Sequence, residues 1–154
     1  MQLTQHADFA LRMMIYLAAR RGQPVAIEVI SQAYGISANH LAKVAQHLVR
    51  LGWVASTRGR AGGLSLTETA WDVPLGVMLA ALESRWDLVE CFRPDSGCVV
   101  EPVCGLKPIL HEAQQAFFSV LDRYTLRDVI TDRSQLVTIF AAPGPSPGQA
   151  EPLT

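Results

Sequence analysis

The sequence has few cysteines and no long apolar segment, and these shortages exclude several classes of protein. No apolar run approaches the roughly 20 residues that a membrane-spanning helix requires. The first residues lack a basic segment followed by an apolar one, so we expect no secretory signal and a cytoplasmic protein. Three cysteines, an odd number, do not suit a disulfide framework. We find no nucleophile–base pair, carboxylate dyad or phosphate loop, so we do not expect an enzyme.

The composition is that of a folded protein whose charge is unevenly distributed. Of the 154 residues, 49% are hydrophobic and 18% are charged, which is not the composition of a disordered chain. The net charge is −1, yet residues 1–70 hold seven Lys and Arg against three Asp and Glu, whereas residues 71–154 hold six against eleven. This asymmetry favours a first part that meets a polyanion and a second part that does not.

Residues 1–70 have the pattern of a small DNA-binding unit. Apolar residues at helical spacing, followed by a change to a period of two, predict three helices and two strands, over residues 4–21, 27–34, 38–51, 54–57 and 64–67. Ser37 offers a hydroxyl N-cap to the third helix. Arg58-Gly-Arg-Ala-Gly-Gly63 suits a hairpin tip, because glycine accepts positive φ. This order predicts a mainly α fold with a small β-hairpin, a winged helix-turn-helix.

The third predicted helix would be the one that enters the major groove of double-stranded DNA. The polar residues near its start lie off its apolar stripe, and we expect them to contact bases or phosphates: Ser37, Asn39, His40 and Lys43. Arg58 and Arg60 on the hairpin would follow the DNA backbone or enter the minor groove. Taken singly, each of these residues could equally be a solvated surface residue. Their joint order favours DNA binding.

Residues 71–140 are predicted to hold a helix from Pro74 to about Arg85, then a loop and a long helix over residues 106–124. The long helix has little of its own chain to pack against, so we expect it to pair with its twin in a homodimer. Thr125-Leu-Arg-Asp128 resembles a capping box for a last short helix. Residues 141–154, rich in Pro and Gly, are predicted to be a disordered tail.

All three cysteines, Cys91, Cys98 and Cys104, lie in one Gly- and Pro-containing segment, the cysteine loop (residues 88–105). Such a loop can bend, so we expect it to bring three thiolates together on a metal centre that a non-cysteine ligand completes. The spacing matches neither structural zinc knuckles nor ferredoxin runs, and it leaves zinc, an iron–sulfur cluster and a thiol redox switch open. Candidates for the further ligand are Glu90, Glu101, His111, His6, Asp8 and His40.

Several motifs together resemble the winged-helix iron–sulfur repressors, especially the nitric-oxide-sensing members. The matching residues, over about residues 1–130, are Met1-Gln-Leu-Thr4, Asp8, Leu11-Arg12, Ile15-Tyr-Leu-Ala18, Tyr34-Gly-Ile-Ser-Ala-Asn-His40, Lys43, Arg58 to Leu66, the three cysteines, Cys104-Gly-Leu-Lys107 and Leu121-Asp-Arg-Tyr-Thr-Leu126. The wing by itself indicates only the wider family. Its combination with the three cysteines is specific.

The resemblance implies a homodimeric repressor with one iron–sulfur cluster per subunit, 4Fe–4S favoured over 2Fe–2S. Cys91, Cys98 and Cys104 would ligate it. An aspartate early in the partner's first helix, at the position of Asp8, can complete such a site, and Arg12 could hydrogen-bond that carboxylate. The holo-dimer would bind operator DNA and nitric oxide would release it.

The alternative is a regulator of the same fold that responds to iron or cluster supply, or to zinc or thiol oxidation. The cluster-biosynthesis repressor of this family has a histidine three residues after its third cysteine, where this chain has Lys107, which disfavours that alternative.

Overall fold

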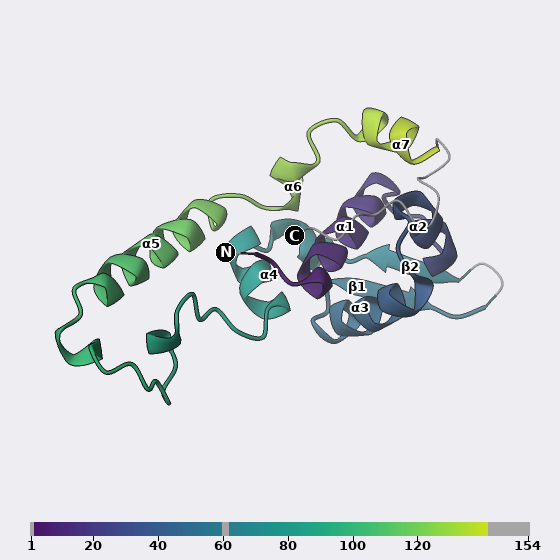
Figure 1. The fold of residues 1–154 in the computed structure, drawn as a ribbon. Helices are drawn as coiled ribbons and strands as arrows, with labels where there is room; N and C mark the ends of the chain where they lie inside the picture. The colour runs from purple at the N-terminus through teal and green to yellow at the C-terminus, as the bar shows by residue number, and fades with distance from the viewer. Residues whose placement is uncertain (1, 60–61, 142–154) are drawn as a thin grey trace.

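The computed structural model describes residues 2–59 and 62–141, and it is mainly helical with one two-stranded antiparallel sheet (Figure 1). This confirms the predicted fold class. The first part, here called the head, consists of five elements: α1 (Gln5–Ala19), α2 (Ile27–Tyr34), α3 (Ala38–Arg50), β1 (Val54–Thr57) and β2 (Gly63–Leu66). No helix within the described ranges is both long and apolar enough to cross a membrane.

Local signals in the sequence account for the ends of the head helices. Thr4 caps α1 by accepting a hydrogen bond from the Ala7 amide at 3.2 Å. Gly35 adopts φ 66° and ends α2, a left-handed conformation that glycine reaches without a steric penalty. Ser37 stands at the N-cap of α3, but its side chain makes no capping hydrogen bond within the described part of the chain, contrary to our expectation.

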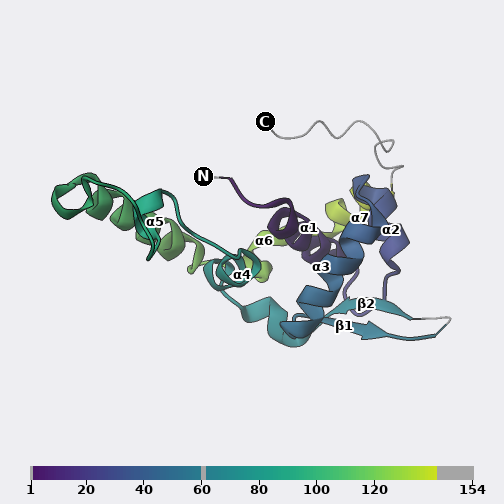
Figure 2. The same cartoon turned by 60° about the horizontal axis from the view of Figure 1, so that its bottom comes forward.

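The core of the head lies between α1 and α3, whose apolar faces meet. Met13, Tyr16, Leu41 and Leu48 are completely buried there. The hairpin packs against α3 through β1. Its two strands are antiparallel, with Val54 opposite Leu66. Figure 2 shows the hairpin extending past the helices of the head. The head therefore presents both α3 and the hairpin on its surface.

After the head, the chain forms η1 (Glu68–Asp72) and α4 (Leu75–Leu82), then η2 (Glu90–Phe92), η3 (Glu101–Val103) and α5 (Leu106–Leu121). Helix α4 ends three residues earlier than predicted. Helix α5 projects away from the head beside the cysteine loop (Figure 1). The structure describes all residues of α5, and none of their side chains is buried. The helix packs against α4.

The chain then returns to the head through α6 (Leu126–Val129) and α7 (Arg133–Ala141). The predicted capping box of α6 is confirmed, with Thr125 and Asp128 capping each other's backbone amides. Helix α7 was not predicted, and it packs on α1, where Arg133 Nε donates to the Ala19 carbonyl at 2.8 Å. Ala141 ends this helix, and the rest of the predicted tail, residues 142–154, lies outside the described residues.

Candidate functional site: DNA-binding helix and cysteine loop

The predicted DNA-contacting residues of α3 lie on its solvent side. Asn39, His40 and Lys43 are exposed on α3, and Ser37 is exposed at its N-cap. Leu41 and Val44 hold the opposite face of α3 in the core. The His40 ring stacks on Phe9 of α1, with ring centroids 6.3 Å apart, so α1 limits how far this side chain can extend. A rigid helix thus presents a polar surface to a potential partner.

The hairpin carries Arg58 directly after β1, and its side chain is exposed. Arg60, the other predicted contact, lies outside the described residues. The hairpin is anchored to the head by Val25, whose amide and carbonyl exchange hydrogen bonds with Leu64 at 2.9 and 2.8 Å. This anchoring fixes the direction in which Arg58 projects relative to α3.

Sequence reasoning missed a pair of histidines that joins α1 to α3. His6 Nε2 lies 2.8 Å from His47 Nδ1, and the two rings are 5.1 Å apart. Burial lowers the pKa of His47, and the neighbouring His6 and Arg50 lower it further. Nothing in the local sequence of His47 identifies a partner 41 residues away.

The cysteine loop holds its thiols on separate turns. Cys91 lies in η2 and Cys104 follows η3 as its C-cap, with Cys98 between the two turns. All three are free and half-buried. Over residues 2–59 and 62–141, no three Cys, His, Asp or Glu side chains are grouped closely enough to hold a metal ion. The outer cysteines thus lie on two separate short helical turns, and their convergence on a metal stays a prediction.

Lys107, the second residue of α5, lies beside the cysteine loop, at the position where the resemblance raised the question of a histidine. Its Nζ lies 2.5 Å from Glu101 Oε1. This hydrogen bond is the main cause that raises the pKa of Lys107, and the negative charges of Cys91 and Cys98 contribute to the same rise. The same bond lowers the pKa of Glu101. Of the local candidates for the further ligand, Glu101 is thus occupied by an ion pair.

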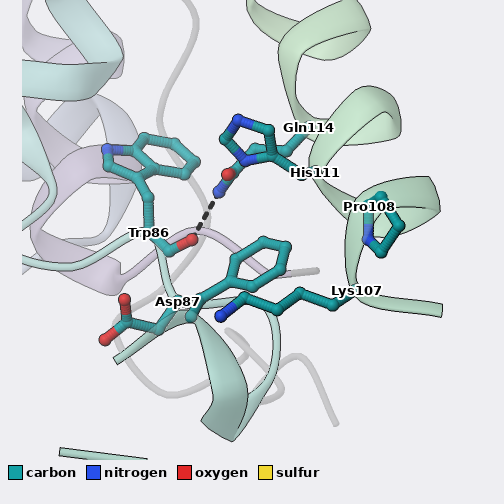
Figure 3. Close-up of a pocket in the computed structure, with 7 residues that line it drawn as sticks. Trp86, Asp87, Lys107, Pro108, His111 and Gln114 are labelled. Atoms are coloured by element: carbon teal, nitrogen blue, oxygen red, sulfur yellow. Dashed lines mark hydrogen bonds between the residues drawn. The ribbon is translucent and has the colours of Figure 1, made fainter. Parts of the chain in front are cut away.

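A pocket of about 580 Å³ lies between the cysteine loop and α5 (Figure 3). Gln114 of α5 donates a hydrogen bond to the Trp86 carbonyl, and both residues line the pocket. The His111 ring lies edge-on to Phe92, with centroids 6.0 Å apart, and its Nε2 is 3.1 Å from Gln115 Nε2. His111 therefore contributes to packing between the loop and α5.

Asp8 and Arg12 form an ion pair on successive turns of α1. Arg12 Nη2 lies 2.9 Å from Asp8 Oδ2, and Arg12 Nε donates to Asp8 Oδ1 at 3.0 Å. The predicted ability of Arg12 to bond this carboxylate is thus present within one subunit. The Asp8 side chain is 34% exposed, so it is accessible from outside the subunit. Sequence reasoning missed a further contact, in which the Tyr34 hydroxyl donates to the Arg12 carbonyl at 3.0 Å.

These features define a class: a helix-turn-helix transcriptional regulator with a winged head. The family model for Rrf2, described as an iron-dependent transcriptional regulator, matches residues 3–132. The chain belongs to the Rrf2 family. It is a transcriptional regulator and not an enzyme, because its relatives are regulators.

Among its relatives is the HTH-type transcriptional regulator NsrR of Bacillus subtilis (strain 168), 42% identical over 142 residues, which are 91% of this chain and 97% of the relative. NsrR of Halalkalibacterium halodurans is 38% identical over the same shares. The predicted resemblance is thus confirmed by relatives that carry the name NsrR.

Solved structures show the same fold. CymR, the global cysteine regulator of B. subtilis, has a TM-score of 0.66 and 25% identity, covering 84% of this chain and 95% of that one. IscR of T. potens has a TM-score of 0.68 and 23% identity, covering 88% of this chain and 90% of that one.

Proposed function

We propose that this protein is a cytoplasmic, homodimeric repressor that binds double-stranded operator DNA while its cysteine loop holds an iron–sulfur cluster, and that nitric oxide releases it from the DNA. The observation that carries the proposal is the cysteine loop. It holds three free thiols, and Lys107 of α5 is fixed beside it by an ion pair with Glu101. The similarity to regulators named NsrR supports the choice of signal.

The donor chemistry of the loop fits an iron–sulfur cluster. Thiolates are the soft ligands that such clusters take. Cys91, Cys98 and Cys104 would provide three of them, and no disulfide occupies them. When bound, the cluster supplies iron that reacts with nitric oxide. The positive charge of Lys107 offsets part of the negative charge that three thiolates bring together, and its bond to Glu101 holds it at the loop.

Asp8 is the residue we propose as the further ligand, provided by the partner subunit. Its side chain is 34% exposed, and it stands early in the first helix, where the resemblance places the ligand from the partner. Arg12 orients the Asp8 carboxylate through two hydrogen bonds. In a dimer, Asp8 would link the first helix of one head to the cysteine loop of the other subunit. This link would fix the separation of the two heads. Two half-sites on one duplex require such a fixed separation.

We assign DNA binding to residues 1–70, and cluster binding and dimerisation to residues 71–140. Within the first unit, Ser37, Asn39, His40 and Lys43 would meet the major groove, and Arg58 and Arg60 the backbone or minor groove. The exposure of the described members of this set supports the assignment.

The test is operator binding by anaerobically purified protein, measured by fluorescence anisotropy before and after addition of nitric oxide. We expect binding to fall with nitric oxide and with iron removal. Undiminished binding by a colourless, iron-free preparation contradicts the proposal. If iron removal abolishes binding while nitric oxide has no effect, the protein is the alternative, a regulator of iron or cluster supply. If the active protein contains zinc and no iron, it is a zinc or thiol regulator.

Lys43→Ala tests the assignment of the recognition surface. Removing one phosphate-contacting cation weakens binding to all DNA sequences alike and lowers the slope of log affinity against log salt by about 1. A matched control is Arg123→Ala, which removes an exposed cation beyond the end of α5. A change in base preference without a change in salt slope assigns Lys43 to a base and not to a phosphate.

A further inference from the structure

Tyr34 contacts Arg12 through two different groups. Its hydroxyl donates to the Arg12 backbone carbonyl at 3.0 Å. Its ring lies 6.0 Å from the Arg12 guanidinium carbon, within the range of a cation–π contact. The same guanidinium holds Asp8 at 2.9 Å. Asp8, Arg12 and Tyr34 thus form a continuous series of polar contacts from the outer turn of α1 to α2.

Tyr34 also stands at the turn that positions the DNA-facing helix. It is the last residue of α2, and Gly35 follows it at φ 66°. Ile36 is then buried, and its carbonyl accepts from the Ser31 hydroxyl at 2.6 Å. Ser37 begins α3 directly afterwards. With Gly35 and Ile36 fixed, a displacement of Tyr34 passes to the start of α3, where the predicted DNA contacts lie.

The ring of Tyr34 is held in place by aromatic neighbours from two other helices. Phe140 of α7 lies 5.5 Å away edge-on, and Tyr16 of α1 lies 6.2 Å away. Burial raises the pKa of the Tyr34 hydroxyl to about 12, so the group remains a hydrogen-bond donor throughout the physiological pH range. A donor of fixed position and fixed protonation can transmit a movement of α1 instead of absorbing it.

We propose that Tyr34 is the positioning residue that couples the Asp8–Arg12 pair to the turn between α2 and α3. This inference rests on the proposed role of Asp8 as the link to the partner's cysteine loop. When the cluster of the partner subunit binds or releases Asp8, the ion pair at 2.9 Å passes the change to Arg12 and so to α1. The hydroxyl bond to the Arg12 carbonyl carries the resulting shift of α1 to the N-terminus of α3.

The test compares Tyr34→Phe with the wild type in iron-loaded and iron-free forms. The measured quantity is the ratio of operator affinities of the two forms, by anaerobic fluorescence anisotropy. Tyr34→Phe keeps the ring and removes only the hydroxyl, so we expect the ratio to fall roughly fivefold, the equivalent of one lost hydrogen bond. Tyr16→Phe is the matched control, because it removes a hydroxyl from the same aromatic cluster, and it should keep the wild-type ratio.

Two outcomes separate this inference from the proposed function. A wild-type ratio of one contradicts the role of iron in DNA binding, and with it the premise of the inference. A large wild-type ratio that Tyr34→Phe leaves unchanged overturns the coupling role of Tyr34 alone. A fall of the affinity ratio in both Tyr34→Phe and Tyr16→Phe overturns the coupling role too. The effect would then come from a general loosening of the aromatic side chains.

Hydrogen exchange gives a second measurement that does not depend on DNA. On iron removal we expect the amides of residues 35–38 to exchange faster in the wild type and to change little in Tyr34→Phe. An Asp8→Asn variant should suppress the same change, and the double variant should add nothing further, because both substitutions interrupt one series of contacts. Additive effects in the double variant contradict a shared route.

Discussion

At the scale of single residues, the contact between His6 and His47 makes the head sensitive to pH. One of the two ring nitrogens donates a hydrogen bond to the other at 2.8 Å, and protonation of the accepting nitrogen removes that bond. Burial is the main cause that lowers the pKa of His47, so the folded head favours the neutral ring. The stabilising contribution is present above the unfolded-state pKa and is lost as the pH falls through the folded-state pKa.

We therefore predict that the free energy of unfolding decreases as the pH falls from about 7 to about 5, because the unfolded chain binds more protons. His47→Gln should flatten this dependence while keeping a polar partner for His6. Urea titrations at several pH values measure it. His111→Gln, an exposed histidine on α5, is the control and should leave the wild-type slope. An unchanged slope in His47→Gln assigns the pH dependence to other groups.

At the scale of elements, the wing depends on a close approach of two backbones. Val25 pairs with Leu64 at the edge of the hairpin, and Gly63 sits directly against Val25. A Cβ at residue 63 would lie 2.7 Å from the Val25 carbonyl oxygen, closer than a real side chain permits. Only glycine allows the hairpin to join the head at this distance.

Gly63→Ala should destabilise the protein by about 1–3 kcal/mol, since a backbone atom cannot move aside as a flexible side chain can. It should also weaken operator binding, because the hairpin and Arg58 would be displaced from α3. Chemical denaturation and anisotropy measure the two effects. Gly105→Ala is the matched control, with no atom within 4 Å of its added Cβ, and should change the unfolding free energy little. Equal effects of the two substitutions contradict the close-approach argument.

At the scale of the whole molecule, α5 exposes an apolar stripe with no partner among the described residues. Leu106, Ile109 and Val120 lie on one side of it at 57, 62 and 46% exposure. A helix without buried side chains has little within one subunit to stabilise it. Pairing with a second copy would bury this stripe, which is the basis of the proposed homodimer.

Ile109→Glu is predicted to shift the protein towards monomer, because it places a charge in the proposed subunit contact. Sedimentation velocity measures the change, and operator affinity should fall with it, since two half-sites would no longer be held together. Gln115→Glu adds the same charge at an exposed position on the other side of α5 and should leave the dimer intact. A dimer that survives Ile109→Glu places the subunit contact elsewhere.

Much of the head could be predicted because its signals are local. The apolar stripe of α3, the stop at Gly35 and the change to a two-residue period each lie within one segment and predict one element. The capping box at Thr125 and Asp128 is of the same kind, since its two residues are three positions apart. The cysteines and exposed polar residues were also identified as candidates, because composition and spacing are properties of the sequence.

The sequence by itself determined the order of the elements, the basic character of the head and the confinement of all thiols to one loop. Only the tertiary structure decided the return of α7 to α1, the pairing of His6 with His47 and the bond from Tyr34 to Arg12. Residues 22 positions apart or more make these last two contacts. Their existence depends on the path of the whole chain, which local spacing does not encode. The placement of Cys91 and Cys104 on two separate turns depends on that path as well.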